Sequence, residues 1–331
     1  MEDDSEYVNT KRKDFYSNNM YLLPQKTLHL GTDQLHEVNE SMLNYFSRTI
    51  GINGIHLGFH FDENINAERL MKMTEEFDLV IVAVGRSGAS LINDIITINP
   101  ELVMSSSKVD IGIRFELPSE LETIKKLDTE LYEWKVKYIT SNGLTVRTFC
   151  HNPHGFVVKE SFDVLGEKIS IVNGHSKKNE KSNNTNLAML VTQEFTSPFN
   201  NSILYGKIVS QQANLLAGSA DKVILQTLGD FKNKKRTKRM FRVLPTLPND
   251  QYLLGDLTYA LPARTYEALI EFIAKLSIVV PEISNYDNLV YGVETKFYGT
   301  KLKNTEKLAF IGDCSGHTRS IVSAACSGYF L

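Results

Sequence analysis

A buried-strand pattern that ends in a glycine turn is the feature that most constrains how this chain can fold. Residues 77–84 form an almost continuous apolar run rich in β-branched side chains, and Gly85-Arg86-Ser87-Gly88 follows directly. Such a run is typical of a strand buried on both faces, as in a parallel sheet. Small residues at the end of such a strand also let a ligand approach the backbone closely, although tight strand–helix turns need glycine in any case.

Helix and strand patterns alternate around this run. The periodicity predicts helices over residues 32–50 and 67–75, and another after Gly88. Apolar residues at Ile55, Leu57, Phe59 and Phe61 alternate as in a strand. Residues 28–98 therefore predict an α/β fold.

The middle of the chain has a different pattern. Alternating apolar residues predict a strand over residues 109–115, and Ser141-Asn142-Gly143 predicts a hairpin between strands at residues 135–139 and 144–150. Further short strands are predicted at residues 156–159, 169–172 and 187–195. This block predicts an α+β domain, rich in antiparallel strands, inserted into the α/β frame.

A second strand–turn–helix segment lies near the end of the chain. A buried-strand pattern over residues 308–313 runs into Gly312-Asp313-Cys314-Ser315-Gly316-His317-Thr318-Arg319, and a helix of small residues follows. A helix N-terminus offers unpaired N–H groups and a positive dipole end, and a carboxylate at a strand end can accept hydrogen bonds from sugar-type hydroxyls. The segment therefore indicates a cofactor turn, with an ordinary strand–helix connection as the alternative.

Five separated segments resemble one protein family in order and spacing. They are residues 82–88, 109–116, 147–155 with 172–176, 291–298 and 309–330. Together they resemble the uncharacterised FAD-dependent dehydrogenase family, also called NAD(FAD)-utilising dehydrogenases, from about Leu22 to the end of the chain. The resemblance implies a Rossmann-like FAD-binding domain with an inserted substrate domain, and oxidoreductase activity on a small-molecule substrate.

The resemblance also implies roles for individual residues. Asp313 would contact the ribityl or pyrophosphate region of FAD, and N–H groups around Gly316, His317 and Thr318 would face the flavin pyrimidine edge. Gly85, Ser87 and Gly88 would approach the adenosine half. The full cofactor-binding set is Gly85, Arg86, Ser87, Gly88, Gly312, Asp313, Gly316, His317, Thr318 and Arg319. NAD(P)H is a further candidate, as the electron donor.

Two departures from the family pattern matter. Cys314 stands where the family has a small residue, either as a redox-active thiol beside the flavin or as a small group filling a tight turn. No Gly-x-Gly-x-x-Gly occurs in the sequence, although the family begins with that pyrophosphate-binding unit. We therefore expect the C-terminal part of a split or truncated flavoenzyme, with a separately encoded N-terminal half as a partner. The alternative is a non-catalytic remnant or binding module that no longer binds FAD.

These patterns set the expected domains. Residues 1–20 are expected to be a polar tail. Residues 21–105 and 285–331 would form the FAD-binding domain without its first βαβ unit, and residues 106–284 the inserted substrate domain.

Four residues are candidates for catalysis. His151 and His175 lie in predicted turns of the inserted domain, as does His154, and they suit acid–base chemistry near neutral pH or local hydrogen bonds in turns. Arg114 lies between apolar neighbours on a predicted strand, where it could bind an anionic substrate or point to solvent, and Lys296 is similar. The histidine spacing predicts no metal site.

Composition narrows the class of protein. The formal net charge is −3, which argues against nucleic acid as the main partner, although residues 232–239 hold six basic residues. That run predicts a solvated loop, with a 2′-phosphate, an RNA or an acidic partner as alternatives. No apolar run approaches the roughly 20 residues that span a bilayer, and the acidic start lacks a signal-peptide pattern. With three scattered cysteines, the cytoplasm is the expected location.

Overall fold

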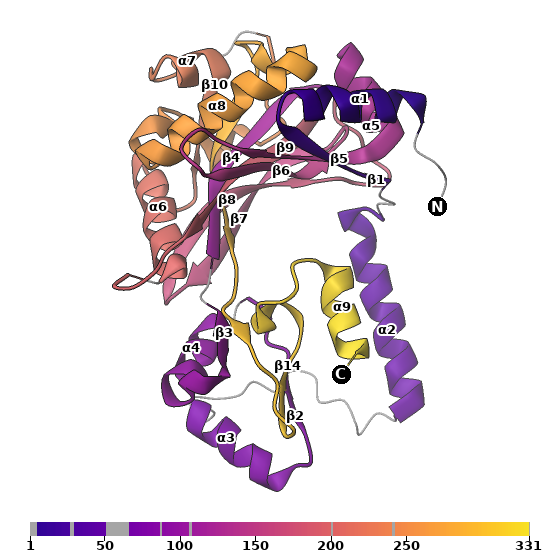
Figure 1. The fold of residues 1–331 in the computed structure, drawn as a ribbon, viewed down its shortest axis with the longest axis vertical. Helices are drawn as coiled ribbons and strands as arrows, with labels where there is room; N and C mark the ends of the chain where they lie inside the picture. Colours follow the sequence, from indigo (N-terminus) through magenta and orange to yellow (C-terminus); the bar gives the residue numbers. More distant parts are fainter. Residues whose placement is uncertain are drawn as a thin grey trace.

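The structure is a computed structural model, drawn as a ribbon in Figure 1. It describes residues 5–26, 30–50, 66–86, 88–105, 108–199, 201–239 and 242–330. In the figure a large sheet with its helices occupies the upper part of the molecule, and a smaller unit around β2 (Val80–Val82) and β14 (Leu308–Phe310) lies below it.

Within the described residues, eight strands form the large sheet in the order β1-β5-β6-β9-β4-β12-β10-β11. Neighbours run antiparallel, except that β10 and β11 are parallel. The strands are β1 (Met20–Lys26), β4 (Lys108–Pro118), β5 (Tyr132–Ile139), β6 (Thr145–Asn152), β9 (Asn184–Glu194), β10 (Val223–Thr227), β11 (Tyr252–Leu254) and β12 (Leu289–Phe297). A separate antiparallel hairpin consists of β7 (Phe156–Val164) and β8 (Glu167–His175).

The centre of the large sheet is covered on both faces. Residues 109–117 of β4 are all buried. The apolar side chains of β4 belong to a core that they share with the helices α5 (Glu122–Leu131) and α8 (Ala263–Val279). The polar side chains of β4 alternate with the apolar ones and are buried as well. Because buried polar groups need partners, these side chains must be satisfied inside the protein.

Further helices of this part are α1 (Glu6–Ser17), α6 (Ser202–Leu216) and α7 (Leu228–Lys232). Short 3-10 helices occupy residues 249–251, 257–259 and 281–284.

Residues 6–17 correct the expected polar tail, because they form the helix α1. Ser5 caps it by accepting a hydrogen bond from the Val8 N–H at 3.3 Å. Val8 and Phe15 are buried in the core of the large sheet. With so few apolar residues in the helix, its sequence carries only a weak periodic signal, and the packing partners that hold it lie far along the chain.

The smaller unit has a parallel strand pair at its centre. β14 pairs with β2 in the register Leu308↔Val80 to Phe310↔Val82, so the parallel pairing expected for the apolar run is confirmed. The expected burial of both faces is wrong, because Ile81 of β2 is 49% exposed. Helices α3 (Ala67–Glu76) and α4 (Ala89–Ile98) pack against this pair through a core that includes Leu70 and Ile92. Further elements are α2 (Leu35–Ile50), β3 (Val103–Ser105), β13 (Lys301–Leu302), α9 (Ile321–Tyr329) and 3-10 turns at residues 32–34, 100–102 and 312–315.

The chain is therefore a mixed α/β protein with a large, mostly antiparallel sheet, as the middle of the sequence predicted. Two strands lie elsewhere than expected. β1 and β12, which the sequence assigned to the FAD-binding domain, pair with β5 and β4 in the large sheet. Local patterns identify a strand but not its neighbours, which explains the difference. The strand predicted over residues 55–61 lies outside the described residues. The Rossmann-like arrangement stays a prediction.

None of the helices in the described ranges combines the length and the apolar character that crossing a membrane requires.

Candidate functional site

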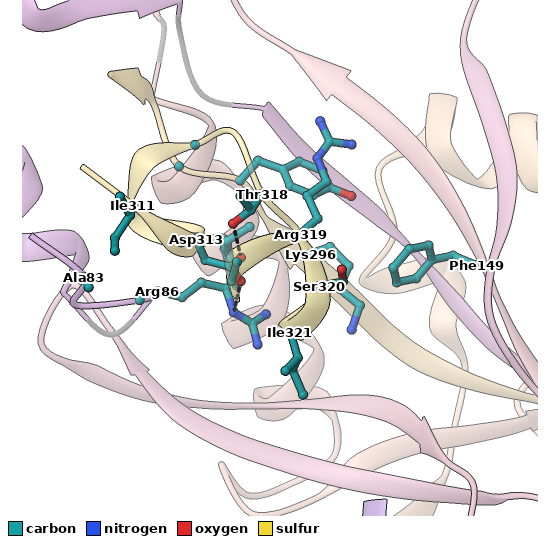
Figure 2. A pocket seen from close by; sticks show the side chains of 17 residues that line it. Ala83, Arg86, Phe149, Lys296, Ile311, Asp313, Thr318, Arg319, Ser320 and Ile321 are labelled. Carbon is teal, nitrogen blue, oxygen red and sulfur yellow. Dashed lines mark hydrogen bonds and ion pairs between the residues drawn. The ribbon is translucent and has the colours of Figure 1, made fainter. Parts of the chain in front are cut away.

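The two glycine turns found in the sequence meet at one cavity. Its volume is about 450 Å³, and its walls include Gly85 and Arg86 from the first turn and five residues of the second, which are Gly312, Asp313, Gly316, Thr318 and Arg319. Lys296 on β12 and Phe149 on β6 complete the wall from the large sheet. Figure 2 shows this cavity, with Arg86, Asp313 and Thr318 close together and Lys296 and Phe149 to one side.

The parallel pairing of β2 and β14 explains why the turns meet. The carboxyl ends of parallel strands lie at the same edge of a sheet, and ligands of α/β proteins bind outside those ends. The Ile311 N–H donates to the Val82 carbonyl at 3.1 Å, which holds the two strand ends together just before the turns begin.

Two glycines leave room for a ligand at this edge. Gly85 has φ +61°, and a Cβ placed there would have no heavy atom within 4 Å. Gly312 has φ +67°, and its nearest neighbour would be the Ala324 Cβ at 3.8 Å. Gly88 has a different reason to be small, since a Cβ there would lie 2.1 Å from a Val84 methyl carbon. Ser87 lies outside the described residues.

Asp313 is the polar centre of the cavity. Its Oδ1 accepts a hydrogen bond from the Thr318 hydroxyl at 2.9 Å, and its Oδ2 lies 3.9 Å from the Arg86 Nε (Figure 2). The Arg86 distance is too long for a hydrogen bond. The Asp313 side chain is 29% exposed, so the carboxylate is held in place and still accessible.

The remaining residues of the second turn serve mainly to build it. The Gly316 N–H donates to the Asp313 carbonyl, and the His317 N–H donates to the Ser315 hydroxyl. Both groups were expected to be free to face a flavin, and in the structure both are used within the turn. The His317 ring bonds the Leu302 carbonyl at 3.1 Å. The Cys314 thiol donates to the Val82 and Ile311 carbonyls, and burial raises its pKa. These contacts favour the small, turn-filling role for Cys314.

Arg319 connects the second turn to the large sheet. Its guanidinium lies 4.1 Å from the centre of the Tyr298 ring, a cation–π contact. The Tyr298 hydroxyl donates to the buried Asp110 at 2.6 Å, and Arg147 binds the same carboxylate oxygen at 2.5 Å. Burial and the Asp110 charge raise the pKa of Tyr298, so the phenol stays neutral.

The charge of the cavity suits a dianionic ligand. Arg86, Lys296 and Arg319 contribute three positive charges and Asp313 one negative charge, which leaves +2. A dinucleotide pyrophosphate carries two negative charges, so charge, open glycines and an accessible carboxylate together fit FAD at this place.

Lys296 belongs both to the cavity and to a partly buried polar cluster behind it, defined here as Arg114, Glu160, Asn173, His175, Glu294 and Lys296. The Lys296 ammonium lies 3.6 Å from Glu294. Asn173 connects the members, because its oxygen accepts from Arg114 at 3.0 Å and its amide donates to Glu160 at 2.8 Å. The His175 ring lies 3.5 Å from the Glu160 carboxylate. The fold thus brings together three of the four catalytic candidates.

Arg114 was expected either to bind an anionic substrate or to point to solvent, and the structure shows neither. Its side chain is fully buried, and its five N–H donors are all used. Two go to Glu294, two to the Cys150 carbonyl and Asn186, and one to Asn173. Arg114 therefore neither points to solvent nor has a donor free for a substrate. It holds Glu294 and Asn173, and through them the rest of the cluster.

Glu160 is ionised in this cluster. Burial alone would raise its pKa, but hydrogen bonding from His175, the positive charge of Lys296 and hydrogen bonding from Asn173 lower it to about 2. A carboxylate beside an imidazole fixes the orientation of the ring, which is the arrangement that acid–base catalysis uses.

His151 lies apart from this site. Its Nε2 is 2.7 Å from Asp128, and its ring packs 4.7 Å from Trp134. The Trp134 indole and the Thr185 hydroxyl also donate to Asp128. The His151 side chain is fully buried and does not line the cavity.

The sequence patterns did not indicate Glu160, Asn173, Glu294, Phe149 and Tyr298 as site residues. Phe149, Asn173, Glu294 and Tyr298 stand in segments that carry the resemblance, so those segments held a signal for them. Glu160 lies outside those segments, and only the pairing of β7 with β8 brings it to His175. Among the described residues, no group of three or more His, Cys, Asp or Glu side chains could hold a metal ion.

The fold and the cavity define a mixed α/β protein with a positively charged cavity at the ends of two parallel strands. The chain matches the family described as FAD-dependent protein, C-terminal domain-like, over residues 111–297. This match covers 187 of 331 residues, more than half, and the chain belongs to that family. The matched segment includes the large-sheet wall of the cavity, whereas both glycine turns lie outside it. The comparison with curated proteins finds no match.

Proposed function

We propose that this chain is the flavin-holding part of an FAD-dependent oxidoreductase, a dehydrogenase acting on a small molecule. One observation carries the proposal. Two strand-end turns from opposite ends of the chain and a lysine of the large sheet line a single cavity of net charge +2. FAD bound there would supply a two-electron acceptor.

In this proposal each cavity residue binds a different part of FAD. Arg86 and Arg319 neutralise the pyrophosphate, and Asp313 accepts hydrogen bonds from ribityl or ribose hydroxyls. Gly85 and Gly312 let the ligand approach the backbone. Lys296 places a positive charge where a reduced, anionic flavin would be stabilised, which raises the reduction potential.

The polar cluster provides the proton transfer. His175 is 35% exposed and its carboxylate partner is ionised, so the ring can exchange protons with solvent, while Lys296 is the member of the cluster that lines the cavity. In this proposal His175 is the acid–base group, Glu160 orients it, and Arg114 positions the cluster. NAD(P)H as electron donor and a cytoplasmic location complete the proposal.

The proposal includes a second component. Since no Gly-x-Gly-x-x-Gly occurs in this sequence, a separately encoded segment would supply the pyrophosphate-binding strand and helix. The smaller unit offers an apolar surface for it: Ile81 on β2 is 49% exposed, and Ile321 and Val322 on α9 are 68% and 73% exposed.

A thermal-shift titration with FAD tests the cradle on this chain directly. At ten times the dissociation constant, FAD is expected to stabilise the folded chain by about 1.4 kcal/mol, a shift of about 2 °C for a chain of this length. Asp313→Ala is expected to abolish the shift. Asp94→Ala, which removes an exposed aspartate of α4 that does not line the cavity, is the matched control.

The wild-type chain showing no shift at millimolar FAD would contradict a cradle that this chain forms by itself and would favour the remnant. Equal shifts in Asp313→Ala and wild type would contradict the assignment of the cradle.

A further inference from the structure

A second, larger cavity adjoins the first. Its volume is about 690 Å³, within the range of small-molecule sites. Gly85, Arg86 and Asp313 line both cavities, as do residues 297–299. A molecule in the second cavity would therefore lie directly beside one bound in the first.

The wall of the second cavity is mostly apolar and comes from both parts of the molecule. The β7–β8 hairpin contributes Phe162, Val164 and Leu165, and α6 contributes Ile203. The Phe162 ring stands at 87° to the Phe297 ring, with centroids 6.1 Å apart, which makes an aromatic corner. Ile92 of α4 closes the opposite side.

The charge of the second cavity differs in sign from that of the first. Arg86 and Asp313 offset each other, and the remaining charged residue in the wall is Asp163, so the net charge is −1. The first cavity carries +2. An anionic ligand is therefore favoured in the first cavity and disfavoured in the second.

A polar side chain on α4, that of Asn93, can orient a ligand by hydrogen bonding. The half-buried side-chain amide of Asn93 lines the cavity and makes no hydrogen bond within the described part of the chain. An amide offers both donors and an acceptor, which suits a hydroxyl or a carbonyl group.

We propose that the second cavity is the substrate site, and that it takes an uncharged, mainly apolar molecule of fused-ring size carrying a hydroxyl or carbonyl group. The role as substrate site rests on the proposed function, since the cavity adjoins the FAD cradle. The binding itself depends only on the residues of the cavity wall.

Direct binding to the full chain without FAD tests the site. The probe is 2-naphthol, followed by its own fluorescence. Ile203→Trp and Asn93→Trp fill the cavity from opposite walls and are each expected to weaken binding at least fivefold. Ile208→Trp, on the same helix α6 but 51% exposed, is the matched control and should bind as the wild type does. Far-ultraviolet circular dichroism establishes that each variant is folded. Unchanged binding in both cavity-filling variants would overturn the proposal.

Charge selectivity gives an independent result. 2-Naphthoate is expected to bind at least tenfold more weakly than 2-naphthol, and Asp163→Asn should improve naphthoate binding by about threefold. Naphthoate binding as tight as that of naphthol would overturn the assigned substrate class. If the chain binds naphthol but shows no FAD-dependent thermal shift, the binding cavity is supported and the oxidoreductase function is contradicted. Failure of the second cavity and failure of the proposed function are therefore distinguishable.

Discussion

The Arg114 guanidinium and the Glu294 carboxylate form a two-point ion pair with no exposure to solvent. The Arg114 Nε lies 2.8 Å from Glu294 Oε2, and its Nη2 lies 2.7 Å from Oε1. The pair joins β4 to β12 at the centre of the large sheet and supports the polar cluster behind the first cavity.

Breaking this pair is expected to destabilise the protein strongly. Arg114→Met leaves the Glu294 charge buried, with Lys296 at 3.6 Å as its nearest remaining cation. The loss of one partner of a buried pair costs about 3–5 kcal/mol, measured as the free energy of unfolding in urea. The double variant Arg114→Met/Glu294→Met should recover part of that loss, because no buried charge is then uncompensated. A single variant that loses under about 1 kcal/mol would contradict the importance of the pair.

The burial of Arg114 shows where sequence reasoning reaches its limit. Alternation on residues 109–115 identified a strand with one apolar and one polar face, and β4 has both. The polar face is nevertheless covered, because β8 packs over it: a Cβ on Gly174 would lie 2.7 Å from the Arg114 Nη1. Which strand covers which face depends on contacts between distant segments, and a local pattern does not contain that information.

The glycine turns could be predicted for the opposite reason. A buried strand, a glycine turn and a helix follow each other within a few residues, so their signal is local. The sequence therefore found Gly85, Arg86, Gly312, Asp313 and Thr318, and the fold brings these five to one cavity. Glu160 and Glu294 could not be found in this way, because each acquires its role from a neighbouring strand.

Two glycine variants distinguish a glycine packed against backbone, Gly316, from one with open space at its Cβ position, Gly85. In Gly316→Ala the new Cβ would lie 2.4 Å from the Thr300 carbonyl oxygen at φ +74°, so both a clash and backbone strain destabilise the fold. In Gly85→Ala the Cβ meets nothing within 4 Å at φ +61°, which leaves a backbone cost of about 1–2 kcal/mol.

Urea unfolding should therefore rank Gly316→Ala as the less stable by at least about 2 kcal/mol. Because Gly85→Ala should remain folded, this variant can test whether FAD approaches the backbone at residue 85. Its FAD-dependent thermal shift should be smaller than that of the wild type. A reversed order of stability would contradict the geometry of the two turns.

His151 is expected to contribute to stability and not to cofactor binding. His151→Leu leaves the buried Asp128 carboxylate without one of its three side-chain partners, the others being Trp134 and Thr185. The free energy of unfolding should fall by about 1–3 kcal/mol. The FAD-dependent shift should match that of the wild type, because His151 does not line the cavity. A selective loss of the FAD shift at unchanged stability would return His151 to the catalytic candidates.

The ionisation of Glu160 makes stability depend on acid pH. Its pKa is lowered in the folded protein to about 2 from an ordinary value of 4.5, so the folded state favours the carboxylate. The stabilisation is fully present above pH 4.5 and is lost as the pH falls toward 2. Since the side chain is 31% exposed, we expect a contribution of about 1 kcal/mol.

Glu160→Gln removes this contribution. In urea unfolding at several pH values, the wild type should exceed Glu160→Gln in stability by about 1 kcal/mol at pH 6, and the difference should vanish near pH 2. Asp163→Asn is the matched control, because Asp163 is an exposed carboxylate on the same strand. Its difference from the wild type should stay constant between pH 6 and pH 2. A Glu160→Gln difference that does not change over this range would contradict the ionised Glu160 carboxylate beside His175 and remove the orienting role of Glu160.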